Sequence, residues 1–257
     1  MARILIIRTG STALEVQAAH GDYDRWFADA MADSRPQLDL CDVTREEIPS
    51  TEAYSGVIIT GSTSAAYRPE PWMERLSAYL KLADGLGHPV LCVCFGAQML
   101  AHARGGRVNL NPAGWEIGGI EVRLTPEAAA DPLFGDLPPT MKALATHEDR
   151  VEELPPGAVL LAGNDCAPVQ AYRVGRRVWG VQFHPEITPS ILDILIGLRA
   201  RELERDAAAH GRDPRGHISR LFATLRDQGA WQGRRILDNF ASLCLRPLEA
   251  TAPGHRA

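Results

Sequence analysis

The sequence predicts an α/β protein, a three-layer sandwich in which helices cover both faces of a central, mostly parallel sheet, followed by a helical C-terminal extension. Short apolar runs alternate with longer amphipathic stretches through the first half of the chain, which is typical of βαβ units. The first of these runs is continuously apolar rather than alternating, as strands buried on both faces are. Hydrophobic residues make up 45% of the 257 residues, enough for a sizeable core.

The first expected strand is the apolar run Arg3–Ile7, directly after the N-terminus. Gly21–Met31 follows as a helix, because it carries large apolar side chains within an amphipathic stretch. Leu38–Val43 is the second expected strand. Gly56–Thr60 is the third, and it ends abruptly at the small polar residues 61–64.

Pro71–Ala83 is expected to form a helix, because proline stands at its start and apolar residues recur at helical spacing. Val90–Val93 is the fourth expected strand. Gly96–Ala103 follows it at once as a helix, so strand and helix are joined by a very short turn.

The middle of the chain changes character. Ile120–Leu124 and Val159–Ala162 alternate between apolar and other residues, as strands with one exposed face do. Val169–Val174 and Arg177–Phe183 predict a β-hairpin that turns around Gly175.

From Pro189 onward the chain is expected to be helical, with Pro214 and Gly216 dividing two helical segments. We interpret residues 1–200 as one domain. Residues 201–257 are then a helical extension that packs on the same domain.

Composition excludes several classes of function. Acidic residues outnumber basic ones, 32 to 27, and the net charge is −5, so nothing favours DNA or RNA as a ligand. Five cysteines at irregular spacing argue against a secreted disulfide framework. No apolar stretch approaches the roughly 20 residues of a membrane span, and the N-terminus lacks a signal-peptide pattern. We therefore expect a soluble, cytoplasmic protein that binds neither nucleic acid nor membrane.

Cys92 and Cys94 come nearest to a metal-binding pattern. On a strand, Cys92 is expected to point to the same side as Cys94, but no third or fourth ligand is evident. We expect no metal and no cofactor.

Cys94 is the sharpest chemical signal. It lies between an apolar strand and a helix, where a tight turn lifts a side chain off the sheet and directs the helix N-terminus toward it. Backbone N–H groups at that position stabilise a thiolate. The alternative is a buried cysteine that serves as a small apolar residue.

His184 and Glu186 offer a base and an acid after another strand, and Pro185 fixes the backbone between them. A neutral histidine can take the thiol proton and return it to a leaving amine, while the carboxylate orients the ring. The alternative is a surface histidine beside a surface glutamate.

The segments CFGAQ and QFHPE, about ninety residues apart, together resemble the class I (triad-type) glutamine amidotransferases. The resemblance runs over nearly the whole chain. Four further segments are similar to that family's oxyanion strand, Gly-Gly segment, Ser-His-x-Asp-x-Val segment and Asn-Phe ending, in that order: Gly56–Ser62, Arg104–Val108, Thr146–Val151 and Ile236–Phe240.

The resemblance implies a flavodoxin-like sandwich with its site at the carboxyl ends of the strands. It also implies a triad in which Cys94 is the nucleophile, His184 the general base and Glu186 its orienting acid. The backbone N–H groups of Ser62 and Phe95 would form the oxyanion hole.

The same resemblance assigns Gly61 and Gln98 to the glutamine-binding site. It assigns the backbone of Thr146, His147 and Glu148 to the α-amino end of the substrate.

The chain departs from the family pattern at two positions. Thr63 follows Ser62 where the family usually has proline, and Cys92 stands where glycine is common. Because the Ser62 donor is a main-chain group and cysteine is small, we expect both turns to form.

The reaction implied by the resemblance is hydrolysis of the side-chain amide of L-glutamine through a γ-glutamyl thioester, with ammonia released to a separate synthase subunit. The chain itself contains no segment that resembles an ATP-binding synthase domain. A standalone γ-glutamyl peptidase that acts on γ-glutamyl conjugates is the alternative with the same triad. A third hypothesis, a binding module without catalysis, is disfavoured because Cys94, His184 and Glu186 are all present.

Overall fold

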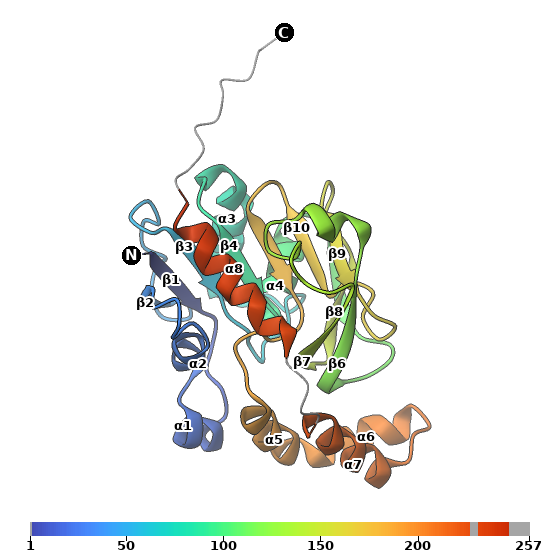
Figure 1. Cartoon of the computed structure of the whole chain (residues 1–257). Coiled ribbons are helices and arrows are strands. Elements are labelled where there is room, and N and C mark those ends of the chain that lie inside the picture. The colour runs from blue at the N-terminus through green and yellow to red at the C-terminus, as the bar shows by residue number, and fades with distance from the viewer. Residues whose placement is uncertain (1, 227–230, 247–257) are drawn as a thin grey trace.

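The structure is a computed structural model that describes residues 2–226 and 231–246. Within these residues, a nine-stranded sheet has the order β2-β1-β3-β4-β11-β10-β9-β6-β7 (Figure 1). The strands from β2 to β11 in this order are all parallel to their neighbours. From β11 onward every pairing is antiparallel. The predicted α/β sandwich is confirmed, and two strands of its parallel part, β4 and β11, lead to Cys94 and to His184 and Glu186.

The parallel strands lie close to where the apolar runs predict them, and the first four agree to within one residue at either end. Their bounds are β1 Arg3–Arg8, β2 Gln37–Asp42, β3 Gly56–Ile59, β4 Val90–Val93 and β11 Val178–Val181. Successive side chains point to opposite faces. Ile4 and Ile6 join one buried cluster, whereas Leu5 and Ile7 join another, so both faces of the sheet are covered.

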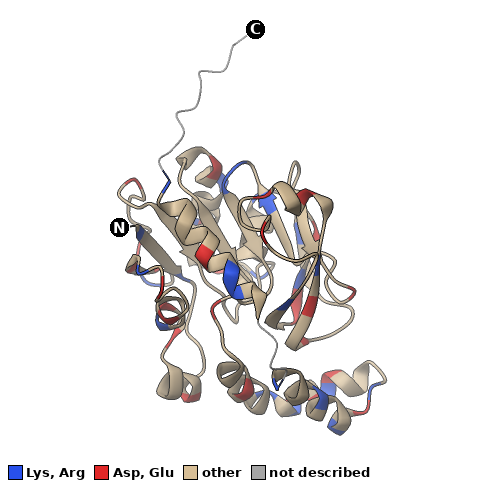
Figure 2. Ribbon diagram, in the orientation of Figure 1, with Lys and Arg blue, Asp and Glu red and all other residues tan. Residues whose placement is uncertain are grey.

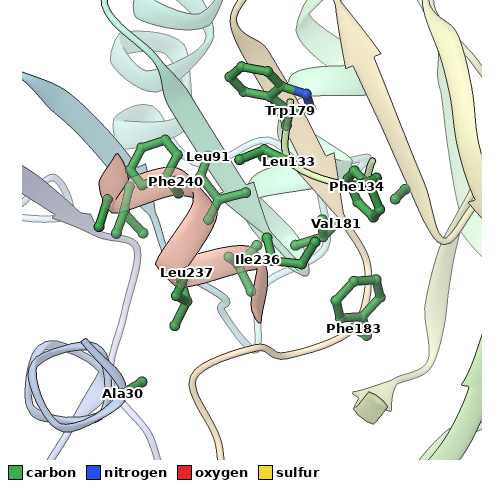
Figure 3. Packing of buried hydrophobic residues seen from close by; sticks show 14 of the residues in the cluster. Ala30, Leu91, Leu133, Phe134, Trp179, Val181, Phe183, Ile236, Leu237 and Phe240 are labelled. Atoms are coloured by element: carbon green, nitrogen blue, oxygen red, sulfur yellow. The ribbon is translucent and has the colours of Figure 1, made fainter. Parts of the chain in front are cut away.

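Helices α3 (Pro71–Leu82) and α4 (Phe95–Ala103) cover one face of this sheet. Helices α2 (Tyr23–Ala30) and α8 (Arg235–Cys244) cover the other. Proline begins α3 as predicted. In Figure 3, Phe240 of α8 lies beside the strand residue Leu91, while Leu237 extends on the side of Ala30 of α2.

Helix α1 (Leu14–His20) was not predicted. Only Val16 of its seven residues is buried, so the segment has no apolar stripe from which a helix can be recognised.

The antiparallel part contains β6 (Glu116–Leu124), β7 (Thr140–His147), β9 (Val159–Gly163) and β10 (Ala171–Val174). The predicted hairpin is confirmed, because β10 and β11 pair in antiparallel fashion. Gly175 lies in its turn with φ +57°, a conformation that glycine adopts without strain.

A second, two-stranded sheet pairs β5 (Arg107–Leu110) with β8 (Asp149–Glu153). This sheet was not predicted, because each strand buries a single residue, Val108 or Val151, and shows no alternation. Three short 3-10 helices complete the described connections: η1 Ala83–Leu86, η2 Pro126–Ala130 and η3 Gln232–Arg234.

After β11 the chain is helical, as predicted, with α5 (Pro189–Leu198), α6 (Ala200–Ala209) and α7 (Pro214–Leu225) grouped below the sheet in Figure 1. Pro214 begins α7, but Gly216 lies inside it and donates its N–H to the Asp213 carboxylate that caps the helix. The expectation that Gly216 divides two segments is therefore wrong.

The division of the chain at residue 200 stays a prediction, and residues 247–257 lie outside the described residues. Among the described residues, no helix combines the length and apolar character needed to cross a membrane.

Candidate active site

Cys94 lies at the turn between β4 and α4, at the carboxyl end of the parallel strands. Its φ of +51° is in the left-handed region, which residues other than glycine rarely adopt. Gly96 makes the tight turn possible, because a Cβ at this position would lie 2.8 Å from the carbonyl oxygen of Ile59. The start of α4 therefore packs closely against the end of β3, next to the strained position of Cys94.

The Cys94 side chain is buried among polar groups. Its Sγ is 3.6 Å from the side-chain nitrogen of Gln182 and 4.0 Å from the carbonyl oxygen of Thr146. The expectation that Cys92 points to the same side is wrong, because Cys92 packs with the residues beneath α4 while Cys94 packs with those of the other face. The turn rotates Cys94 out of the strand's alternation, and burial raises the pKa of the Cys92 thiol.

His184 and Glu186 follow β11, the strand next to β4. His184 Nδ1 is 2.7 Å from Glu186 Oε1, and both side chains are almost fully buried. A methyl group on Gly61 would lie 3.1 Å from His184 Cε1 and 3.6 Å from Cys94 Cβ. The structure therefore brings the sulfur, the imidazole and the carboxylate together beside Gly61.

The electrostatics favour a protonated His184. Burial lowers the pKa of the ring, but the neighbouring Glu186 carboxylate and Cys94 sulfur outweigh it and raise the pKa to about 10. At neutral pH the ring then holds its proton beside the sulfur. Within the described residues, His184 Nε2 has no hydrogen-bond partner, so it is available to a reacting group.

Ser62 and Phe95 are the two predicted backbone donors of the oxyanion hole. Ser62 lines the same pocket as Cys94, and Phe95 is the first residue of α4. N–H groups in the first turn of a helix have no acceptor within the helix. Within the described part of the chain, neither the Ser62 nor the Phe95 N–H donates a hydrogen bond to another residue. Both remain available to an oxyanion.

The side chains of Gln98 and His147 form hydrogen bonds with other residues of the protein. The Gln98 amide nitrogen donates to the carbonyl oxygen of Asp149 and to Gln182 Oε1, at 3.0 and 3.2 Å. His147 is buried, with Nδ1 2.9 Å from the Asp149 carbonyl oxygen and Nε2 2.8 Å from a carboxylate oxygen of Glu116. These contacts fix the wall of the pocket.

Thr146 and Glu148 flank His147 and line the pocket. The Thr146 hydroxyl accepts a hydrogen bond from Arg199 at 3.3 Å. The Glu148 side chain reaches the surface. Its pKa is raised by the part of the side chain that is buried and, to a smaller extent, by the nearby Glu202 carboxylate.

Sequence reasoning missed Gln182, Glu116 and Arg199. Gln182 stands two residues before His184, so its place in QFHPE was the available signal. Glu116 accepts hydrogen bonds from His147, Asn164 and Gln170 in the protein interior. A single acidic residue between two apolar ones was the only sign of this arrangement.

The pocket around Cys94 has a volume of about 500 Å³. It is bordered by the loop after β1, by α2, by the turn after β3, by the end of β7 and by α5 and α6. Its lining residues include Tyr23, Trp26, Ser62, Cys94, Gln98, Trp115, Thr146, His147, Glu148, His184, Leu198, Arg199 and Glu202.

Comparison with known proteins places this geometry in context. The family model for glutamine amidotransferase class-I matches residues 20–196. Gamma-glutamyl peptidase 4 of Arabidopsis thaliana is 32% identical over 209 residues, which cover 79% of this chain and 78% of the peptidase. One subunit of the glutamine-hydrolyzing GMP synthase of Natronomonas pharaonis is 31% identical over 180 residues, which cover 68% of this chain and 89% of that protein.

A solved glutamine amidotransferase structure from Methylobacillus flagellatus superposes with a TM-score of 0.73. The two chains are 21% identical, and the superposition covers 100% of this chain and 99% of the other. At this identity the likeness concerns the fold.

Proposed function

This chain belongs to the class I glutamine amidotransferase family of enzymes, and from that premise we propose that it hydrolyses γ-glutamyl amides with Cys94, His184 and Glu186 as its catalytic triad. The observation that carries the proposal is the convergence of the three groups beside Gly61, with Cys94 and His184 lining a pocket. The protonated ring beside the sulfur supports it further, because an imidazolium stabilises a thiolate.

In the proposed reaction, the Cys94 thiolate attacks the side-chain carbonyl carbon of the γ-glutamyl group. The Ser62 and Phe95 N–H groups stabilise the negative charge on the oxygen. His184 gives its proton to the leaving nitrogen, the carbon–nitrogen bond breaks, and a γ-glutamyl thioester remains. His184 then takes a proton from water, whose oxygen attacks the thioester, and glutamate leaves as the thiolate re-forms.

Substrate contacts are proposed for the residues that border the sulfur. Gly61 leaves room for the γ-glutamyl chain, because a side chain there would meet both His184 and Cys94. The Gln98 side chain and the backbone of residues 146–148 face the same pocket.

The leaving group could be ammonia or a larger amine, and the size of the pocket supports the larger amine. A volume of about 500 Å³ equals roughly 17 water molecules at about 30 Å³ each, whereas glutamine has only about ten non-hydrogen atoms. The similarity to a gamma-glutamyl peptidase over most of both chains also supports a γ-glutamyl conjugate as substrate.

L-glutamine, with ammonia passed to a separate synthase subunit, is the second candidate. The similarity to a GMP synthase subunit that is itself a separate chain supports it. The triad chemistry is the same, so the leaving group and the need for a partner distinguish the two candidates.

The test compares kcat/KM of the isolated protein for L-glutamine and for a γ-glutamyl dipeptide, with Cys94→Ala as the inactive control. We expect the dipeptide to be preferred about a hundredfold, which corresponds to about 2.7 kcal/mol of transition-state binding. A preference for glutamine, or activity that appears only with a synthase partner, would replace this conclusion by the second candidate.

A further inference from the structure

Arg199 stands at the junction of α5 and α6 and lines the same pocket as Cys94 and His184. Its backbone is fixed on both sides. The Arg199 N–H donates to the Leu195 carbonyl oxygen at 3.1 Å, and its own carbonyl accepts from the Leu203 N–H at 2.9 Å. The guanidinium therefore extends into the pocket from a rigid point.

The guanidinium is half-buried and held by neutral groups. Its Nη1 donates to the Thr146 hydroxyl at 3.3 Å, and its central carbon lies 5.2 Å from the ring centroid of Trp115. A cation over an indole face is oriented by the ring quadrupole and keeps its remaining donors free. These contacts position the charge but supply no counterion.

No carboxylate of the described residues forms an ion pair with Arg199. By contrast, Arg212 nearby pairs with Asp206 at 2.9 Å. The ribbon in Figure 2 shows positions of acidic and basic residues interspersed along α6, so carboxylates are present in this part of the fold. A partly desolvated guanidinium that lines the pocket without one indicates an anionic group on the ligand.

Thr146 connects this charge to the reacting sulfur. Its hydroxyl accepts from Arg199, while its carbonyl oxygen lies 4.0 Å from Cys94 Sγ. In a γ-glutamyl compound, only three carbon–carbon bonds separate the carbonyl carbon under attack from the α-carbon. An α-carboxylate is therefore within reach of the guanidinium when the carbonyl carbon is at the sulfur.

We infer that Arg199 binds the α-carboxylate of the γ-glutamyl substrate and so selects amino acid derivatives with a free carboxylate. The inference rests on the proposed function. Glu148 and Glu202 line the same pocket, and their carboxylates would attract the α-ammonium group of the substrate. Arg199 could instead bind a carboxylate on the leaving group, and the choice of substrates in the experiment distinguishes the two carboxylates.

The experiment measures kcat/KM for three compounds: γ-glutamylglycine, γ-glutamylethylamide, which has no carboxylate in its leaving group, and the α-carboxamide of γ-glutamylethylamide, which has no carboxylate at all. Arg199→Gln should lose roughly 10- to 100-fold on the first two compounds, mainly through KM, and nothing further on the third. Arg199→Lys should retain part of the activity, because it keeps the charge. Arg201→Gln removes an exposed arginine outside the pocket and serves as the matched control, with wild-type rates expected.

A loss confined to γ-glutamylglycine would overturn the inference and assign Arg199 to the leaving group. Equal losses on all three compounds would overturn it in favour of a structural role. If the wild-type protein cleaves none of them, the proposed function fails, and calorimetric binding of L-glutamate then decides the inference alone. We expect Arg199→Gln to weaken that binding tenfold or more, and unchanged binding would refute the role of Arg199.

Discussion

In the proposed mechanism, the reactivity of the site depends, at the scale of single residues, on a proton held by His184. The Glu186 carboxylate is one cause of the raised pKa of this ring, which is about 10. The alkaline limb of kcat/KM should therefore lie near pH 10 in the wild-type protein, because above this pH the ring loses the proton that it gives to the leaving nitrogen. Glu186→Gln removes the negative charge and should move that limb to lower pH. A pH–rate profile measures the shift, and an alkaline limb that does not move would show that Glu186 does not act on His184.

The Gln182 amide gives a second prediction at this scale. Its nitrogen is 3.6 Å from Cys94 Sγ, and its oxygen accepts from Gln98. Gln182→Met keeps a similar volume but removes the donor, so kcat should fall roughly 10- to 100-fold while the protein stays folded. Steady-state kinetics together with a melting curve check this. A fall in melting temperature with unchanged kcat would assign Gln182 to packing alone.

The site residues differ in how visible they are in the sequence. Cys94 and His184 stand out because strand-end motifs surround them. Arg199 and Glu116 do not, since each is a single charged residue without a local pattern. Their significance comes from contacts with Thr146 and His147, which only the fold brings close.

At the scale of elements, close packing of α4 on β3 positions Cys94, the proposed nucleophile. A Cβ on Gly96 would lie 2.8 Å from a backbone oxygen of β3, so Gly96→Ala must push the helix away from the sheet. We expect this substitution to destabilise the protein by about 1–3 kcal/mol and to reduce activity more than tenfold.

Gly197 in α5 is the matched control, because nothing lies within 4 Å of a Cβ built there. Gly197→Ala should increase the free energy of unfolding by about 0.5–1 kcal/mol. Denaturant unfolding of the two variants measures both effects. Equal behaviour of the two alanines would contradict the packing argument.

Elements with a strong apolar pattern were predictable, and weakly buried ones were not. The parallel strands β1, β3 and β4 bury both faces and appear in the sequence as unbroken apolar runs. Helix α1 and the β5–β8 pair bury one residue per element, so tertiary contacts rather than local pattern determine them.

At the scale of the whole molecule, the buried carboxylate of Glu116 connects the interior of the antiparallel part to the pocket. It forms a hydrogen bond with His147, which lines the pocket. Burial raises the pKa of Glu116, but hydrogen bonds from His147, Asn164 and Gln170 outweigh it and hold the pKa below its usual value. A carboxyl group with a lowered folded-state pKa contributes stability above its unfolded value, about 4.3, and the contribution disappears as pH falls through the folded value. Glu116→Gln should therefore lower the free energy of unfolding by about 1–3 kcal/mol at pH 7, because an amide nitrogen cannot accept the hydrogen bonds that a carboxylate oxygen accepts.

The difference between wild type and Glu116→Gln should shrink as pH falls below about 4. Glu121→Gln, an exposed position on the same strand, is the control and should change little. Melting curves recorded from about pH 3 to about pH 8 measure both variants. A constant difference across this range would mean that Glu116 does not act through its charge.

For the whole molecule, the order of the layers could be predicted from the sequence, but the number of strands in the sheet could not. The strand β6 pairs with β7 and β9, which follow it at increasing distance along the chain, and such long-range pairing leaves no local signal. The return of α8 to the core beside α2 was likewise visible only as an Asn-Phe resemblance.

The most direct test of the central claim, that Cys94 is the nucleophile toward γ-glutamyl carbonyl groups, is intact-mass analysis after treatment with 6-diazo-5-oxo-L-norleucine, a glutamine analogue with an electrophilic carbon at the amide position. The wild-type protein and Cys92→Ala should each gain one adduct that maps to Cys94, and excess γ-glutamyl dipeptide should slow the labelling. Cys94→Ala should gain none. Labelling of Cys94→Ala at the wild-type rate, or an adduct on Cys92, would contradict the account.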